Sequence, residues 1–281
     1  MAFDAKGDLY VADTGEFDLT FVKRSVLRKI VSGANVITLA SLPDGTLTTQ
    51  NTGIAVDGVG SVYVSTSACP SIAVPSVFLN CGGEVSRVTA EGVRTTLQVN
   101  GANTSFNRPF GIALDSASII YVAELNAQAI SKIAADRQSS SVLQISYPSH
   151  LAVDQDGSLY AVTTNYPSAS NTNGASYQIA RINKDGTRQI LADGVGGGAE
   201  TAGIAADAKG NVYVADSTSL RKISPVGVVT TIAGTGFSTA PLPLSPVPLP
   251  SQIGPARALA IFGADLYVSA GSAIAVIHNV P

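Results

Sequence analysis

His150 is the first candidate for acid–base chemistry, because the chain contains only two histidines and the other, His278, follows the last apolar run and is expected at the surface. Histidine titrates near neutral pH and can act as a general acid or base. Three similar segments carry glycine at the position of His150. A ring that fills the space left by glycine and forms a hydrogen bond is the structural alternative. Glu124 is the second catalytic candidate, and it could equally cap the loop after its strand.

A further set of polar and aromatic residues stands beside predicted strands and forms a candidate ligand-binding group. Its members are Asn51, Arg108, Phe110, Glu200, Arg257, Asp13 and Asp216. Paired arginines such as Arg108 and Arg257 could bind a carboxylate or phosphate in a bidentate manner. They could also pair with Glu200, since crowded charges generally find partners.

The elements that must position these residues form an internal repeat, which is the main feature of the sequence. GIAVDGVGSVYV at 53–64 returns as GIALDSASIIYV at 111–122 and GIAADAKGNVYV at 203–214. The six copies are marked by Tyr10, Tyr63, Tyr121, Tyr160, Tyr213 and Tyr267, spaced by 53, 58, 39, 53 and 54 residues. Each copy reads as two β-strands around a tight turn, which in four copies begins with Asp and carries Gly three residues later. The third copy has Ser118 in place of this Gly, and the sixth shortens the turn by one residue around Gly263.

Two more strands follow in most copies, so each repeat predicts a four-stranded antiparallel sheet. In the second copy these strands are EVSRV and VRTTLQV, within 84–99. Sheets of this kind repeated every 39–58 residues predict an all-β fold, a six-bladed β-propeller. We expect one domain over residues 1–281. The last blade has only three predicted strands, so we also expect that residues before Met1, including a signal peptide and a closing strand, are missing from this chain.

The long connections all fall on one face of the predicted propeller, where the second strand of a blade leads to the third and one blade leads to the next. Examples are residues 66–83, 163–177 and 237–255. Loops on a rigid scaffold commonly carry function. We therefore expect a site on this long-loop face, at the mouth of the central channel, with the candidate residues around it.

The repeat resembles the NHL family, through GIAAD…YVAD, LRKI and TTIAGTG, most closely at 220–236. The resemblance covers nearly the whole chain and implies a six-bladed propeller related to the lactonase and lyase group. That group includes binding scaffolds, sensor domains and enzymes, so the resemblance leaves function open. A zinc site with three histidines would need more than the two present. A divalent cation such as Ca²⁺ at the channel mouth is an alternative that Asn51 and Glu200 would support, although the two arginines would repel it.

Composition limits the classes of partner and compartment. Hydrophobic residues make up 45% and charged residues 13%, which excludes a disordered chain. The net charge of −3 argues against nucleic acid as a partner, and no apolar run is long enough to span a membrane. Cys69 and Cys81 lie in one loop and are expected to form a disulfide rather than a catalytic thiol, contributing about 3 kcal/mol. A disulfide would place the protein outside the cell or in the periplasm.

These observations favour a secreted, monomeric propeller that binds a protein, glycan or small-molecule ligand at its long-loop face. A lyase or hydrolase that uses His150 and Glu124 is the first alternative. A sensor domain of a longer protein is the second.

Overall fold

The computed structural model describes residues 1–13, 25–31, 35–42, 49–68, 81–165, 176–195, 201–216, 219–234, 256–270 and 273–280. Every regular element within these ranges is a β-strand, and none is a helix that could cross a membrane. The chain divides into two compact units, Met1–His150 and Leu151–Pro281, and each is described by itself.

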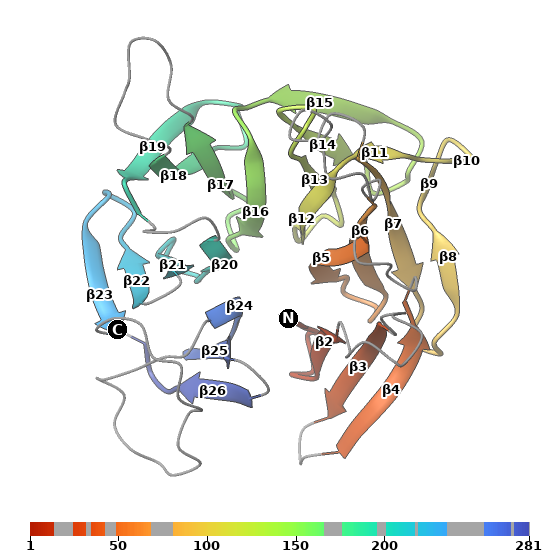
Figure 1. The fold of residues 1–281 in the computed structure, drawn as a ribbon, viewed down its shortest axis with the longest axis horizontal. Helices are drawn as coiled ribbons and strands as arrows, with labels where there is room; N and C mark the ends of the chain where they lie inside the picture. Colours follow the sequence, from red (N-terminus) through yellow and green to blue (C-terminus); the bar gives the residue numbers. More distant parts are fainter. Residues whose placement is uncertain are drawn as a thin grey trace. The chain divides into compact units, whose positions relative to one another are not determined.

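The first unit contains three antiparallel sheets and the start of a fourth (Figure 1). The first sheet consists of β1 (Ala2–Phe3), β2 (Leu9–Asp13), β3 (Val26–Val31) and β4 (Asn35–Ser41). The second contains β5 (Thr49–Val56), β6 (Val62–Ala68), β7 (Gly82–Val88), β8 (Arg94–Thr96) and β11 (Phe106–Asn107), with β9 (Gln98–Val99) and β10 (Ala102–Asn103) as a separate hairpin. The third consists of β12 (Pro109–Leu114), β13 (Ile120–Glu124), β14 (Ala129–Ile133) and β15 (Ser140–Gln144).

The second unit continues the fourth sheet and contains the last two. The fourth sheet consists of β16 (Pro148–Val153), in which the boundary between the units falls, β17 (Leu159–Asn165), β18 (Ser176–Ile182) and β19 (Arg188–Asp193). The fifth consists of β20 (Thr201–Ala206), β21 (Val212–Asp216), β22 (Ser219–Ile223) and β23 (Val229–Ala233). The sixth has three strands, β24 (Ala256–Phe262), β25 (Asp265–Ala270) and β26 (Ala273–Ile277).

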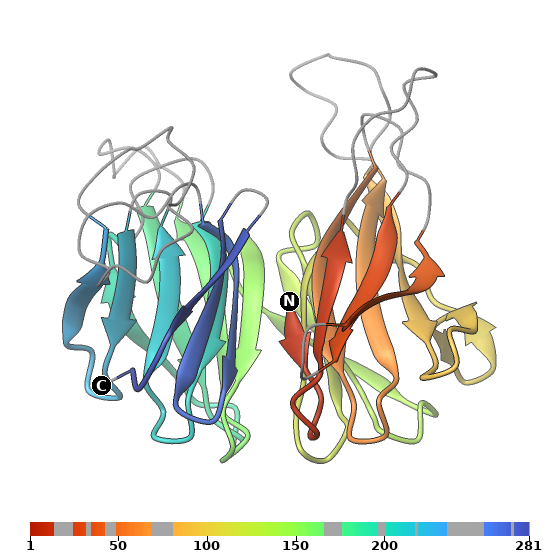
Figure 2. The ribbon, with the colours of Figure 1, turned by 90° about the horizontal axis from the view of Figure 1, so that it is seen from below.

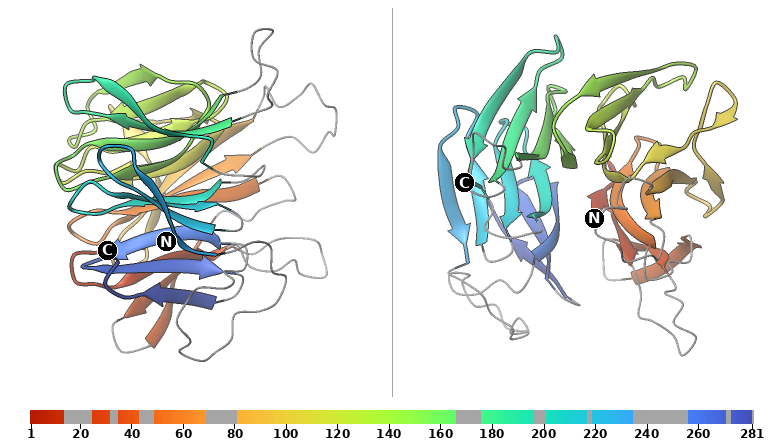
Figure 3. Two further views of the ribbon diagram at one scale, coloured as in Figure 1. Left: turned by 90° about the vertical axis from the view of Figure 1, so that its left-hand side faces the viewer. Right: turned by 45° about the horizontal axis from the view of Figure 1, so that its top comes forward.

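The strands of each sheet lie side by side, mostly in chain order, as the blades of a propeller do (Figures 1 and 3). The predicted fold class is confirmed: the chain is an all-β, six-bladed propeller with a smaller last blade. The prediction of a single domain over 1–281 stays a prediction.

Apolar side chains form the core between successive sheets inside each unit. In the first unit, Val85 and Leu97 of the second blade pack with Ile120 and Val122 of the third. In the second unit, Tyr160 and Val162 of the fourth blade pack with Val212 and Val214 of the fifth. Burying a side chain of this size contributes roughly 1.5–3 kcal/mol, so these interfaces between blades are a main source of stability.

The recurring alanines of the first strands pair with the marker tyrosines of the second strands. Ala55 pairs with Tyr63, and Ala113 pairs with Tyr121. Residues directly opposite each other in an antiparallel pair share one face of the sheet. Ala55 and Ala113 are each 7% exposed, and a small residue at this position leaves room for the tyrosine ring beside it.

The second blade departs from the expected pattern, because its predicted strand VRTTLQV is interrupted after Thr96. Leu97 is 2% exposed, and its backbone N–H donates to the Val85 carbonyl at 2.8 Å. The chain then forms the β9–β10 hairpin, in which Asn100 and Gly101 both have positive φ, as a type I′ turn requires. It returns through Phe106, which is 3% exposed. Two buried anchors thus hold the ends of a hairpin that strand alternation alone could not predict.

Candidate functional site

The two ends of each sheet differ in chemistry. The turn end holds the Asp–Gly turns between first and second strands, and the loop end lies opposite, where second strands end and third strands begin (Figure 2). The candidates Asp13, Glu124, Arg108, Phe110 and His150 belong to the loop end of the first unit.

Glu124 ends β13 and holds two neighbouring segments together. One carboxylate oxygen, Oε2, accepts the backbone N–H of Asn107 at 2.7 Å, and the other, Oε1, accepts the Ser131 hydroxyl at 2.5 Å. Asn107 lies in β11 of the second blade and Ser131 in β14 of the third, so this carboxylate joins two blades. Its hydrogen bonds match a capping role, the structural alternative weighed for Glu124.

Asp13 ends β2 and forms an ion pair across the first blade. Its Oδ2 accepts a hydrogen bond from Arg28 Nε on β3 at 2.7 Å. The two side chains are 37% and 42% exposed, so solvent screens this pair and its contribution to stability is small.

Arg108 and Phe110 lie at the start of β12, where the chain makes an irregular approach to β13. Arg108 has a φ of 54°, and its carbonyl accepts the N–H of Leu125 at 3.1 Å. The pairing of β12 with β13 shifts register between Pro109 and Ile112. A β-bulge of this kind redirects the side chains around it. The Phe110 carbonyl accepts the Ser65 hydroxyl at 2.6 Å, which ties this segment to the second blade.

His150 lies beside Phe110, with the two rings edge to face and their centroids 5.1 Å apart. Its Nδ1 is 3.3 Å from the Ser149 hydroxyl. Burial lowers the pKa of His150 to about 4, and the positive amino group of Met1 lowers it further. This pKa lies well below the near-neutral value expected from the sequence, because burial disfavours the charged imidazolium. The ring is therefore neutral at pH 7.

Other copies carry glycine at the position of His150, and at Gly53 close packing explains why. A Cβ on Gly53 would lie 2.7 Å from the Phe110 carbonyl oxygen and 2.8 Å from the Ile112 nitrogen. Only glycine permits this approach of β12 to β5. The surroundings of His150 differ, because they accommodate its side chain, whose ring packs against the ring of Phe110.

The structure does not test several of the predicted site residues. Glu200 and Cys69 lie outside the described residues, and the structure gives only the backbone positions of Asn51, Asp216 and Arg257. Cys81 is 2% exposed, and its disulfide with Cys69 stays a prediction. Among the residues that the structure describes, no three histidine, cysteine, aspartate or glutamate residues form a group that could hold a metal ion.

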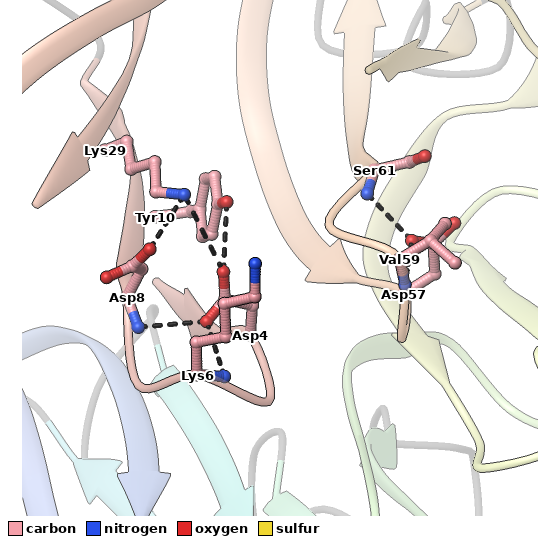
Figure 4. Close-up of polar contacts among 8 residues, drawn as sticks. All are labelled: Asp4, Lys6, Asp8, Tyr10, Lys29, Asp57, Val59 and Ser61. Carbon is pink, nitrogen blue, oxygen red and sulfur yellow. Dashed lines mark hydrogen bonds and ion pairs between the residues drawn. The ribbon is translucent and has the colours of Figure 1, made fainter. Parts of the chain in front are cut away.

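The turn end contains a repeated hydrogen-bond motif that the sequence analysis identified only in part. In the first blade, Asp4 Oδ1 accepts the N–H groups of Lys6 and Asp8 at 2.9 and 3.0 Å (Figure 4). Its Oδ2 accepts the Tyr10 hydroxyl at 3.2 Å. Aspartate–tyrosine pairs of the same spacing recur at Asp57–Tyr63, Asp115–Tyr121, Asp154–Tyr160 and Asp207–Tyr213. The sequence predicted that these aspartates begin the turns, but it did not predict the tyrosine contact, although both residues recur six positions apart.

These pairs shift the tyrosines away from ionisation. Burial raises the pKa of Tyr121 to about 12, and the charge of Asp115 raises it further. Burial also raises the pKa of Tyr160 and of Tyr213. A cation on the third strand lies over several of the rings, with Lys29 Nζ 5.1 Å from the Tyr10 ring centroid and Arg181 Cζ 5.9 Å from that of Tyr160. The buried hydroxyls therefore act as hydrogen-bond donors at neutral pH.

Comparison with known proteins finds likeness at the level of the fold. No protein-family model matches the chain, and no curated protein matches it. The crystal structure of a nidogen/laminin complex is similar with a TM-score of 0.66 and 17% identity, over 97% of this chain and 90% of that chain. Virginiamycin B lyase from Staphylococcus aureus gives 0.50 and 14%, over 96% and 88%. A putative gluconolactonase gives 0.54 and 13%, over 83% and 78%.

The fold and these neighbours define the class of the protein, a six-bladed β-propeller. The resemblance to NHL-type and lactonase-like propellers is confirmed at the level of the fold. Such similarity does not assign an activity, because propellers host unrelated functions.

Proposed function

We propose that the protein is a non-catalytic binding module that contacts a protein, glycan or small-molecule ligand at its loop end. The observation that carries the proposal is the engagement of Glu124, whose two carboxylate oxygens both accept hydrogen bonds from the protein itself. A general acid or base must reach the proton it transfers. Glu124 is committed to holding β11 and β14, and Asp13 pairs with Arg28.

The comparisons support the proposal in a limited way. The nidogen/laminin structure is a complex of two proteins and has the highest TM-score of the three neighbours named above. A propeller of this shape can therefore take part in a protein complex. We propose that the present chain also binds a partner, and that the long connections between its strands form the binding surface.

A binding screen with matched charge variants tests the proposal. The wild type, Arg108→Glu at the loop end and Lys209→Glu at the turn end would be applied to printed arrays of glycans and proteins. We expect at least one ligand that binds the wild type and Lys209→Glu but binds Arg108→Glu at least ~10-fold more weakly. Circular dichroism would confirm that both variants are folded. Ligands that bind both variants equally, or an absence of any ligand, would contradict the proposal.

An enzyme of the lyase or hydrolase type is the second candidate, with His150 as a proton acceptor. The ring of His150 is neutral at pH 7 and could act there only as a proton acceptor, although a pKa of about 4 makes it a weak base. A divalent cation such as Ca²⁺ would assist such a reaction. Elemental analysis of the wild type beside His150→Ala separates the two functions: a stoichiometric divalent ion that is lost in the variant would favour the enzyme.

We also propose an extracellular or periplasmic location, which rests on the predicted Cys69–Cys81 disulfide. Mass spectrometry of a non-reducing digest would show the linked peptides. Two alkylated free thiols in protein from its native compartment would contradict this location.

A further inference from the structure

The outer edge of β15 is a free sheet edge within the part of the chain that the structure describes. β15 pairs with β14 on one side, and no described strand pairs with its other side (Figure 1). Four of its five side chains are exposed, and Val142 is 60% exposed. Exposed strand edges present N–H and C=O groups that can pair with another strand.

The outermost strands of the other described four-stranded sheets carry features that hinder such pairing. A bulge interrupts the pairing of β4, of β19 and of β23 with the strand beside each. In the second blade, β8 has only three residues. β15 has a continuous register from Ser140 to Gln144, and it contains no charged residue and no proline. Bulges, short strands and charges are the usual means of protecting an edge, so β15 lacks all three.

The hydrogen bonds at the ends of β15 determine which of its backbone N–H and C=O groups point to the outer edge. The Ala134 N–H donates to the Ser139 carbonyl, and the Ile145 N–H donates to the Gln128 carbonyl, so positions 139 and 145 bond toward β14. Hydrogen-bonded and non-hydrogen-bonded pairs alternate along an antiparallel ladder. The N–H and C=O groups of Ser140, Val142 and Gln144 therefore point to the outer edge.

This pattern is self-complementary about Val142. We propose that two copies of the chain associate through β15, antiparallel, with a two-fold axis at Val142. Val142 then faces Val142 of the second copy, and Ser140 faces Gln144 of the second copy. The apolar pair buries two exposed valines, and the hydroxyl–amide pairs satisfy polar groups. No charge is present on either strand, so the pairing places no like charges opposite each other in the ladder.

The contact is small, so the dimer is weak and dependent on concentration. Interfaces below about 1,200 Å² are typical of transient association. The monomer expected from the sequence is then the state of the protein at low concentration. In the three-stranded sheet, the edge strand β26 has five half-buried side chains and is less accessible to a second molecule.

Sedimentation velocity tests the dimer and its register between about 10 µM and about 1 mM, the range of weak association. We expect the wild type to dimerise as concentration rises. Val142→Lys and Val142→Glu should each stay monomeric, because like charges would face each other across the axis. An equimolar mixture of the two variants should dimerise again, because opposite charges then meet.

The control is Val59→Lys, which adds the same charge at a turn valine that is 79% exposed, and should dimerise as the wild type does. Thermal melting would show that each variant is folded. A wild type that stays monomeric throughout, or a Val142→Lys variant that still dimerises, overturns the proposal. A mixture that fails to associate overturns the two-fold register.

Discussion

His150 shows how the surroundings of one side chain change its chemistry. The ring packs edge-on against Phe110 and sits beside Ser149. An imidazolium there would lose hydration, so its pKa falls to about 4. The neutral ring packs against Phe110 within the first unit. In any proton transfer at pH 7, His150 would have to be the acceptor.

This lowered pKa predicts a loss of stability on the acid side. An unfolded histidine takes up a proton near pH 6.5, whereas folded His150 does so only near pH 4. The contribution of His150 to the free energy of unfolding is therefore fully present above about pH 6.5, and it is lost as the pH drops toward 4. Urea unfolding should show that the free energy of unfolding decreases less between pH 7 and pH 5 in His150→Gln than in the wild type.

His278→Gln provides the control, since His278 is exposed, pairs with Asp265 and belongs to the other compact unit. This variant should keep the acid-side loss that His150 causes. An equal decrease in His150→Gln and in the wild type would show that other groups are responsible.

At the scale of elements, the turn between the third and fourth strands fixes one blade on the preceding one. In the second blade, Gly92 has a φ of 87° and lies against the Leu39 carbonyl of β4. The corresponding turn of the third blade has Arg137 with a φ of 57°, and its side chain donates to the Tyr63 hydroxyl of the second blade. The same turn position thus contacts the preceding blade through backbone in one copy and through a side chain in the next.

Gly92→Ala should destabilise the protein through this contact. A Cβ at position 92 would lie 2.4 Å from the Leu39 carbonyl oxygen, so β4 would have to move. Gly101→Ala is the matched control, because its φ of 75° carries the same left-handed cost without any atom within 4 Å. We expect Gly101→Ala to cost about 1 kcal/mol and Gly92→Ala at least ~1 kcal/mol more. Equal losses in urea unfolding would contradict a packed turn.

At the scale of the whole molecule, repetition supplies stability through contacts between neighbouring blades. The cores join the first blade to the second and the second to the third in one unit, and the fourth to the fifth and the fifth to the sixth in the other. Among the described residues of each unit, these cores lie between neighbouring blades, as in repeat proteins.

The expected single domain predicts one cooperative transition on heating. Differential scanning calorimetry should give a calorimetric enthalpy equal to the van't Hoff enthalpy. Two transitions, one for Met1–His150 and one for Leu151–Pro281, would show that the two compact units unfold separately.

Most of the fold could be predicted because its determinants are local and repeated. The aspartate and glycine of each turn and the alternation of its strands are set within about a dozen residues. Even the substitution of Ser118 for glycine fits, since Ser118 adopts a φ of 60° at that position. The β9–β10 hairpin was missed because strand alternation does not show that Leu97 and Phe106 are both buried.

The candidate site depended on tertiary structure. The sequence identified Glu124, Arg108, Phe110 and His150 as residues beside strand ends, and by itself it determined that they belong to the loop end of a propeller. It could not show that Asn107 and Ser131 hydrogen-bond to Glu124, or that Phe110 packs on the ring of His150. Those contacts join residues up to 40 positions apart. Hydrogen bonding and burial depend on which atoms lie nearby in space, and only the tertiary structure decided that.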